Sequence, residues 1–136
     1  MDEAVIRIFL VDDDDDDREF FTDVLHEMFP NIVIDTFDNG VSLMGALLTS
    51  RDRPPDIVFI DLFMPLMDGE ECLADIRTEP VFATLPIVIY SGYPDKEWVD
   101  SLMEQGADRY LQKPTTFRDM KTALSECLIS FGLVGP

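Results

Sequence analysis

Short, continuous apolar runs alternate along the chain with segments in which apolar residues recur every third or fourth position. The runs at 5–11, 57–60 and 87–90 are rich in β-branched residues and end at a charged or turn residue. Such runs predict strands buried on both faces, as in the interior of a parallel sheet. The runs at 32–37 and 109–112 mix apolar with polar side chains, which predicts strands at the sheet edges.

Five amphipathic segments follow these strands, one after each, and each predicts a helix. Their expected apolar faces comprise Phe20, Phe21, Val24, Leu25, Met28 and Phe29; Val41, Met44, Leu47 and Leu48; Cys72, Leu73 and Ile76; Trp98, Val99, Leu102 and Met103; and Phe117, Met120, Leu124, Cys127, Leu128 and Phe131. Asp14 is a candidate N-cap of the first helix. Two positions stay open for Trp98: the core, or an outward face that would mark a docking surface.

Strands that alternate with helices at this spacing predict an α/β fold, a doubly wound five-stranded parallel sheet with right-handed crossovers and helices on both faces. A length of 136 residues fits one domain. The sequence has no internal linker or repeat, and little chain follows Phe131. We therefore expect residues 1–136 to form a single domain, with no room for an appended effector domain.

Acidic residues dominate the charge: 28 Asp and Glu against 10 Lys and Arg give a net charge of −18. Such a domain is repelled by nucleic-acid phosphates and by anionic lipids, so we expect neither as a partner. The chain has no apolar run of membrane-spanning length and no basic signal-peptide start. Cys72 and Cys127 lie in apolar helical patterns, which predicts buried thiols in a reducing compartment. These features predict a cytoplasmic protein.

Residues with chemical potential follow the predicted strands directly. Asp12 and Asp13 follow the first strand, Asp61 the third, Ser91 the fourth and Lys113 the fifth. The carboxyl ends of parallel strands meet at one edge of the sheet, so these side chains are expected to converge. Three carboxylates repel one another, and a divalent cation together with the lysine would neutralise them.

Ligands that are all oxygen favour magnesium or manganese over zinc. A carboxylate beside such a cation, with a lysine and a hydroxyl nearby, is suited to accept a phosphoryl group. The further acidic residues Asp15, Asp16 and Asp17 are expected to be a solvated helix start. His26 is expected on the surface, and Cys72 and Arg77 are assigned to helix packing and the surface.

Four segments carry motifs in a consistent order: Val-Asp-Asp-Asp at 11–14, Asp-Ile-Val-Phe-Ile-Asp-Leu-Phe-Met-Pro-Leu-Met-Asp-Gly at 56–69, Ile-Tyr-Ser-Gly at 89–92, and Gly-Ala-Asp-Arg-Tyr-Leu-Gln-Lys-Pro at 106–114. Together they resemble the response-regulator receiver domain of two-component signalling, over essentially the whole chain. The resemblance implies a flavodoxin-like sheet with strand order 2-1-3-4-5.

The resemblance also implies a role for each residue at this edge. Asp61 would be the phosphoacceptor, and Asp12, Asp13, Asp61 and the backbone carbonyl of Phe63 would hold Mg²⁺ or Mn²⁺. Lys113 and Ser91 would bind the phosphoryl group, Gly92 would leave it an approach path, and Tyr110 would act with Ser91 as the switch. A cis bond between Lys113 and Pro114 is also implied.

The implied partners are a histidine kinase or a histidine phosphotransfer protein as donor. A downstream protein would dock on the surface formed by the fourth helix, fifth strand and fifth helix. The sequence does not identify either partner, and it does not determine the oligomeric state. On this interpretation the chain is not an enzyme with an external substrate; it accepts a phosphoryl group and removes it from itself.

Two large side chains depart from the family pattern. Phe63 stands two positions after Asp61, and Tyr93 stands two positions after Ser91. Both are expected to flank the path by which water reaches the phosphoryl group. The sequence therefore predicts slow loss of the phosphoryl group.

Two other functions compete with this interpretation. A phosphohydrolase of the haloacid-dehalogenase type also uses an Asp-x-Asp pattern after its first strand, here Asp12 and Asp14, but it requires Thr or Val where this chain has Asp16. A pseudo-receiver that acts only as a scaffold is disfavoured by the complete set of Asp61, Ser91 and Lys113.

Overall fold

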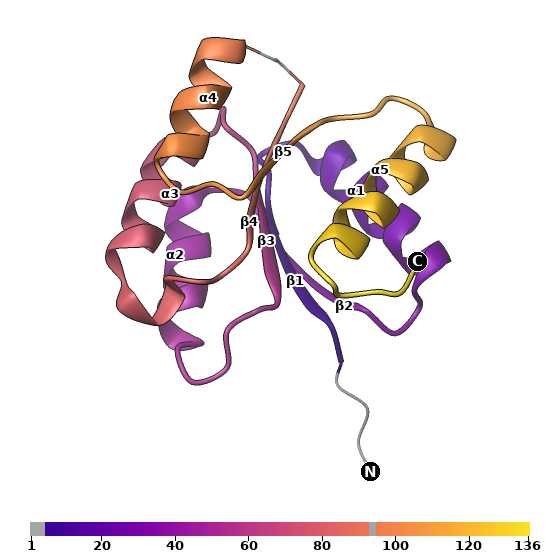
Figure 1. Ribbon diagram of the computed structural model, residues 1–136, viewed down its shortest axis with the longest axis horizontal. Helices are drawn as coiled ribbons and strands as arrows, with labels where there is room; N and C mark the ends of the chain where they lie inside the picture. Colours follow the sequence, from indigo (N-terminus) through magenta and orange to yellow (C-terminus); the bar gives the residue numbers. More distant parts are fainter. Residues whose placement is uncertain (1–4, 93–94) are drawn as a thin grey trace.

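The computed structural model describes residues 5–92 and 95–136, which form one parallel sheet flanked by helices (Figure 1). The strands are β1 (Arg7–Val11), β2 (Val33–Phe37), β3 (Ile57–Ile60), β4 (Ile87–Ser91) and β5 (Arg109–Gln112). They pair in the order β2-β1-β3-β4-β5, and every pair is parallel. This confirms the flavodoxin-like, doubly wound fold predicted from the sequence.

Helices cover both faces of the sheet. They are α1 (Asp15–Met28), α2 (Gly40–Thr49), α3 (Gly69–Thr78), α4 (Lys96–Glu104) and α5 (Phe117–Ser130), with a short 3₁₀ helix, η1 (Pro80–Phe82), after α3. Helices α2, α3 and α4 lie on one side of the sheet and α1 and α5 on the other (Figure 1). The sequence did not predict η1, which begins at the proline that follows α3.

Alternate residues of each strand supply the two halves of the core. In β1, Phe9 and Val11 pack on the side of α2 and α3, whereas Ile8 and Leu10 pack on the side of α1 and α5. This alternation is the period of two that a strand imposes on its side chains. All residues of β3 and β4 are buried, while β2 and β5 are partly exposed, which confirms the interior and edge strands.

The predicted apolar face of α2 was wrong in part. Val41 and Leu48 are 56% and 39% exposed, and the buried face instead runs through Gly40, Leu43 and Leu47. A Cβ at Gly40 would lie only 2.5 Å from the Met67 carbonyl oxygen, so α2 approaches the β3–α3 loop through this glycine. That close approach sets the rotation of the helix, and periodicity alone does not reveal it.

Three smaller expectations also fail. Strand β1 begins at Arg7, where pairing with β2 begins, and Val5 is exposed. Phe117 is 40% exposed at the start of α5, with the Lys121 ammonium group over its ring. No peptide bond between described residues is cis, so the bond between Lys113 and Pro114 is trans, the isomer that the amide intrinsically favours.

Candidate functional site

The carboxyl edge of the sheet carries a polar pocket of about 530 Å³. Asp12 and Asp13 enter it directly after β1, Asp61 directly after β3, Ser91 as the last residue of β4, and Lys113 directly after β5. Its lining is completed by Asp14, Asp17, Phe63 and Gly92. The structure therefore brings together the five residues that the sequence predicted to converge.

Three carboxylates of the pocket lie close enough to share a cation. Asp12, Asp13 and Asp61 each offer an oxygen, and these oxygens lie within 4.8 Å of one another. Asp12 and Asp61 are buried, whereas Asp13 is exposed and can admit an ion from solvent. Asp12 is held in place because its Oδ1 accepts a hydrogen bond from the Asp14 backbone N–H at 3.0 Å. Hard oxygen donors in this arrangement fit magnesium or manganese.

Lys113 is the cation of the pocket and lies among its carboxylates. Its ammonium group donates hydrogen bonds to Asp12 Oδ2 at 2.7 Å and to Asp17 Oδ2 at 2.8 Å. Asp61 Oδ2 lies 3.5 Å from Nζ, within ion-pair distance. The backbone N–H of Lys113 donates to the Ser91 carbonyl at 2.9 Å, so the start of the β5–α5 loop is tied to the end of β4.

Burial and crowding shift the protonation of this site. Burial raises the pKa of Asp61 to about 7; the Lys113 ammonium opposes this shift, and the Asp12 carboxylate adds to it. For Lys113, burial disfavours the charged form, but the hydrogen bonds to Asp12 and Asp17 outweigh it and hold its pKa above the usual range. Without a cation, Asp61 is thus a carboxyl group that ionises near neutral pH.

Asp17 was wrongly assigned to a solvated helix start. Its side chain is 41% exposed, lines the pocket and pairs with Lys113. Asp17 lies in the first turn of α1, within a run of six consecutive aspartates whose sequence holds no signal that distinguishes it from its neighbours. Asp15 and Asp16 are exposed as expected, and Asp14 is confirmed as the N-cap that accepts hydrogen bonds from the Asp16 and Asp17 N–H groups.

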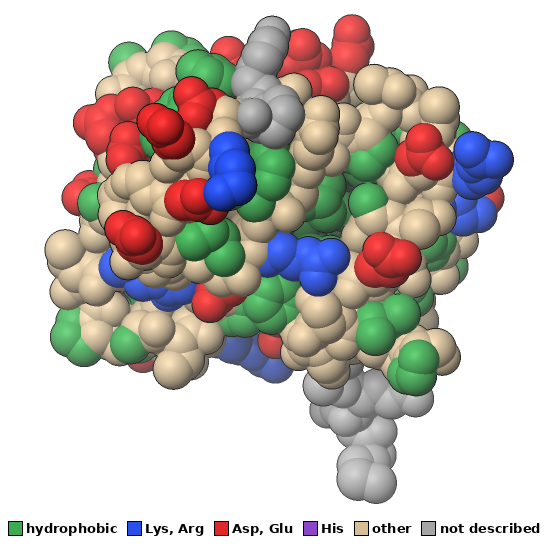
Figure 2. All heavy atoms as spheres, turned by 45° about the horizontal axis from the view of Figure 1, so that its top comes forward, with side chains coloured by type: hydrophobic (Ala, Val, Ile, Leu, Met, Phe, Trp, Pro, Cys, Tyr) green, Lys and Arg blue, Asp and Glu red, His purple; other side chains and the backbone are tan. Residues whose placement is uncertain are grey.

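The additional carboxylate changes the charge balance expected from the sequence. Asp12, Asp17 and Asp61 lie within ion-pair distance of the Lys113 ammonium group, and Asp13 lines the same pocket. With a divalent cation present, these four carboxylates and Lys113 carry one net negative charge instead of reaching neutrality, and Asp14, which caps α1, is a further carboxylate in the pocket lining. Acidic side chains also gather over much of the surrounding face, including the side of α3 and α4 (Figure 2).

Glycines keep the surroundings of Asp61 both close-packed and open. A Cβ at Gly69 would lie 2.4 Å from the Asp61 carbonyl oxygen, so only glycine lets α3 begin this close to the end of β3. A Cβ at Gly92, by contrast, would meet no atom of the described residues within 4 Å. The described residues therefore leave space beside Gly92, and its role as an approach path stays a prediction.

Phe63 lines the pocket and also contacts α4. Its side chain is half exposed and meets Trp98 edge to face, with ring centroids 5.3 Å apart. Trp98 is half-buried, and its Nε1–H donates to Glu70 of α3 at 3.2 Å, so it lies between the two positions considered from the sequence. Tyr93, the other side chain expected to control water access, lies outside the described residues.

Two tyrosines flank the residues of β4 and β5 in the pocket. The Tyr110 hydroxyl donates to the Ser91 carbonyl at 3.2 Å, which places it beside its expected switch partner. Tyr90, which the sequence analysis did not single out, lies with the Lys113 ammonium 5.2 Å from its ring centroid. The Tyr90 ring is buried against α5, where its hydroxyl faces Met120 Sδ at 3.8 Å.

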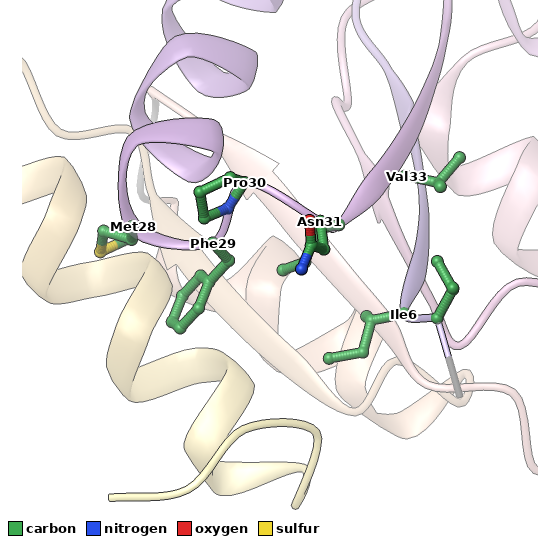
Figure 3. Close-up of a pocket in the computed structure, with 8 residues that line it drawn as sticks. Ile6, Met28, Phe29, Pro30, Asn31 and Val33 are labelled. Carbon is green, nitrogen blue, oxygen red and sulfur yellow. The ribbon is translucent and has the colours of Figure 1, made fainter. Parts of the chain in front are cut away.

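Another hollow, of about 590 Å³, lies at the opposite end of the sheet (Figure 3). Its lining is mostly apolar and includes Ile6, Phe29, Pro30 and Val33. None of the described residues that line it carries a charge, so these residues offer no group for phosphoryl or metal chemistry. His26 is exposed nearby, where its Nε2 and the Ile32 carbonyl oxygen lie 2.9 Å apart, in keeping with the surface position expected for it.

The protein is thus of the flavodoxin-like α/β class, with an acidic pocket at the carboxyl edge of its sheet. The family model of the response regulator receiver domain matches residues 8–125. The chain therefore belongs to the response regulator receiver domain family, as its motifs indicated.

The chain matches one named relative over nearly its whole length and others over only part of theirs. The chemotaxis protein CheY of Halobacterium salinarum is 29% identical over 122 residues, which cover 90% of this chain and 96% of that protein. The sensor histidine kinase TmoS of Ectopseudomonas mendocina is 30% identical over 129 residues, 95% of this chain but 12% of the kinase. The chain likewise spans about half of the C4-dicarboxylate response regulator DctR of Bacillus subtilis.

Solved structures share the fold at low sequence identity. The phosphorylated cyanobacterial phytochrome response regulator RcpA superimposes with a TM-score of 0.85 at 22% identity, covering 94% of each chain. The Mn²⁺-bound form of response regulator Rcp1 gives a TM-score of 0.79 at 24% identity, covering 96% of each chain. Among the described residues, no helix has the length and apolar character needed to cross a membrane.

Proposed function

We propose that this chain is a phosphoacceptor response regulator in which Asp61 receives a phosphoryl group from a histidine kinase or a histidine phosphotransfer protein. One observation carries the proposal: a buried carboxylate that faces Asp12 and Asp13 within 4.8 Å and a lysine at 3.5 Å, in a pocket open to solvent. Phosphoryl transfer depends mostly on such positioning and charge stabilisation.

The transfer is a displacement at phosphorus. An Asp61 carboxylate oxygen forms the new O–P bond as the P–N bond to the donor imidazole breaks, and the leaving nitrogen keeps the electron pair. Lys113 lies beside Asp61 to pair with a phosphoryl oxygen, and Ser91 lies at the end of the neighbouring strand to hydrogen-bond another. Gly92 leaves room for the incoming group.

Asp12, Asp13, Asp61 and the backbone carbonyl of Phe63 would hold the Mg²⁺ or Mn²⁺ ion. A bound divalent cation would offset the repulsion among the carboxylates and neutralise charge on the phosphoryl oxygens. The carboxylate spacing fits such an ion. Similarity to the Mn²⁺-bound response regulator Rcp1 supports the same choice of metals.

Phosphorylation would be read out through Ser91 and Tyr110. A phosphoryl group that draws the Ser91 hydroxyl inward frees space beside β4, and Tyr110 can turn into it. The result would be a population shift at the surface of α4, β5 and α5, to which a downstream protein docks. The Tyr110 hydrogen bond to the Ser91 carbonyl provides the link between the two residues.

The competing functions have less support. Asp12, which would be the nucleophile of a haloacid-dehalogenase-type phosphohydrolase, is fully buried and paired with Lys113, and Asp14 caps α1. A scaffold that is never phosphorylated would gain nothing from carboxylates that repel one another in a buried position. The single-domain extent of 1–136, the cytoplasmic location and the lack of nucleic-acid or membrane partners stay predictions.

Labelling with a phosphodonor tests the proposal directly. The wild-type chain, incubated with phosphoramidate and Mg²⁺, is expected to gain one phosphoryl group on Asp61, and Asp61→Asn is expected to gain none. Mass spectrometry of the intact protein measures both. Equal labelling of the two proteins would refute Asp61 as the acceptor, and continuous turnover of a phosphomonoester would favour the phosphohydrolase.

The switch makes a separate prediction. Beryllofluoride mimics the phosphoryl group, and adding it together with Mg²⁺ is expected to change amide chemical shifts in α4, β5 and α5. Tyr110→Ala is expected to reduce these distant changes. Changes near Asp61 should persist in that variant. If the wild-type changes stay within the loops that line the pocket, coupling through Ser91 and Tyr110 is wrong.

A further inference from the structure

We propose that Asp17 is a positioning residue for Lys113: it holds the ammonium group in place to act on the phosphoryl group that Asp61 accepts. The inference rests on the proposed function of Asp61 and deepens it. It assigns a task to the one pocket carboxylate that neither the charge arithmetic nor the family motifs included.

The contacts of the Lys113 ammonium group carry the argument. Two of its three N–H groups are used by Asp12 Oδ2 at 2.7 Å and Asp17 Oδ2 at 2.8 Å. Asp61 Oδ2, at 3.5 Å, lies beyond ordinary N–H···O distance. These two hydrogen bonds leave the third N–H available for a phosphoryl oxygen on Asp61, whose Oδ2 is already within ion-pair distance of the ammonium group. A lysine side chain is a flexible stem of four carbons, so the position of its ammonium group must be fixed by such hydrogen bonds.

The fold determines where the Asp17 side chain points. Asp17 belongs to the first turn of α1, and its backbone N–H donates to the side chain of the N-cap, Asp14, at 3.1 Å. The cap and the turn therefore fix the Asp17 backbone relative to the end of β1. From this position its carboxylate reaches Lys113, 96 residues further along the chain.

The pair differs from an ordinary surface ion pair. The Lys113 side chain is only 17% exposed and Asp12 is not exposed at all, so Asp17 closes the solvent side of a largely buried contact. Exposed pairs contribute little because water competes with them. Loss of Asp17 would leave a poorly hydrated ammonium with one hydrogen-bond partner and a freer side chain.

Charge alone predicts the opposite effect. A fourth carboxylate makes the pocket more negative, which repels an incoming anionic phosphoryl group. If repulsion dominated, removing Asp17 would speed phosphorylation. If positioning dominates, as we propose, removing Asp17 slows it, and a neutral side chain that keeps an acceptor oxygen preserves the rate.

Three variants separate these effects. Asp17→Ala removes both the acceptor and the charge, whereas Asp17→Asn removes the charge but keeps an acceptor oxygen and the size. Asp16→Ala is the matched control, because Asp16 is exposed in the same turn and carries the same charge. The rate of Asp61 labelling by phosphoramidate is measured for each at saturating Mg²⁺, so that changes in metal affinity do not contribute.

We expect Asp17→Ala to be labelled roughly tenfold more slowly than wild type, because a misplaced charged group forfeits much of its effect in the transition state. Asp17→Asn is expected within about twofold of wild type, since its oxygen still accepts from Lys113. Asp16→Ala should match wild type. Faster labelling of both Asp17 variants, or unchanged labelling of Asp17→Ala, overturns the proposal.

A second measurement does not depend on phosphorylation. An ammonium group held by two carboxylates exchanges its protons slowly, so its ¹H–¹⁵N signal is expected for Lys113 in wild type and in Asp17→Asn, and is expected to disappear in Asp17→Ala. A signal that persists in Asp17→Ala refutes the positioning role even if Asp61 is never labelled. Absence of labelling in wild type with the expected ammonium signals would instead refute the proposed function alone.

Discussion

Asp61→Asn is expected to stabilise the folded protein, in the absence of divalent cations, by roughly 3 to 4 kcal/mol at about pH 8. Folding buries the Asp61 carboxyl beside Asp12 and Asp13 and raises its pKa from 3.8 to about 7. Above that pKa, the folded state must hold an ionised carboxylate in an unfavourable place. Asparagine has nearly the same shape and carries no charge, so it removes this penalty.

The dependence on pH has a definite sign. Because the pKa of Asp61 is higher in the folded state than in the unfolded state, the folded protein binds the proton more tightly. Its contribution to stability is complete below about pH 4, is lost as the pH rises from about 4 to about 7, and stays lost above that range. The difference between wild type and Asp61→Asn should therefore be large at about pH 8 and small near pH 4.

Urea unfolding of the two proteins at several pH values measures this difference. Mg²⁺ should stabilise wild type by mass action and narrow the gap, while Asp13→Ala, which removes a cation ligand, should lose that response. Asp16→Asn serves as the control for net charge, because Asp16 is exposed. If Asp61→Asn gains no more stability than Asp16→Asn at about pH 8, then the ionised Asp61 carboxylate does not destabilise the folded state.

Much of the fold follows from the sequence because short local patterns of apolar and polar residues indicate the strands and where they end. Continuous apolar runs predict the interior strands, and the parallel order of these strands places Asp12, Asp61 and Lys113 at one edge, as the structure has them. Parallel topology makes that step reliable, because every strand delivers its carboxyl end to the same edge. The residues that converge in the pocket were therefore predictable.

What the sequence missed depends on how helices are rotated and packed against the sheet. Asp17 reaches Lys113 only because the cap at Asp14 fixes how α1 leaves β1, and a run of six aspartates gives no local sign of which ones turn inward. The buried face of α2 depends likewise on the approach of Gly40 to Met67. These are tertiary contacts, and hydrophobic periodicity along the chain does not predict them.

The phosphorylated state is expected to be long-lived, and Phe63→Asn with Tyr93→Glu is expected to shorten its lifetime about tenfold, a change of roughly 1.4 kcal/mol in the barrier. Dephosphorylation requires a water oxygen in line with the phosphorus, opposite the Asp61 oxygen whose bond breaks. Phe63 lines the pocket with a large apolar ring that can neither orient nor easily admit that water. Smaller or polar side chains would do both.

The experiment labels Asp61 with phosphoramidate, removes the donor, and follows loss of the phosphoryl group at saturating Mg²⁺. Phe63→Asn alone measures the share of the side chain seen in the pocket, because Tyr93 lies outside the described residues. Leu66→Asn is the matched control: it makes a similar apolar-to-polar change in the same loop, at a side chain 79% exposed. If wild type and Leu66→Asn lose the phosphoryl group as fast as the double variant does, then water reaches the phosphorus by a route that Phe63 and Tyr93 do not block. Faster decay only in the proteins that carry Phe63→Asn would locate the barrier at the Phe63 ring, whose contact with Trp98 holds it beside the pocket.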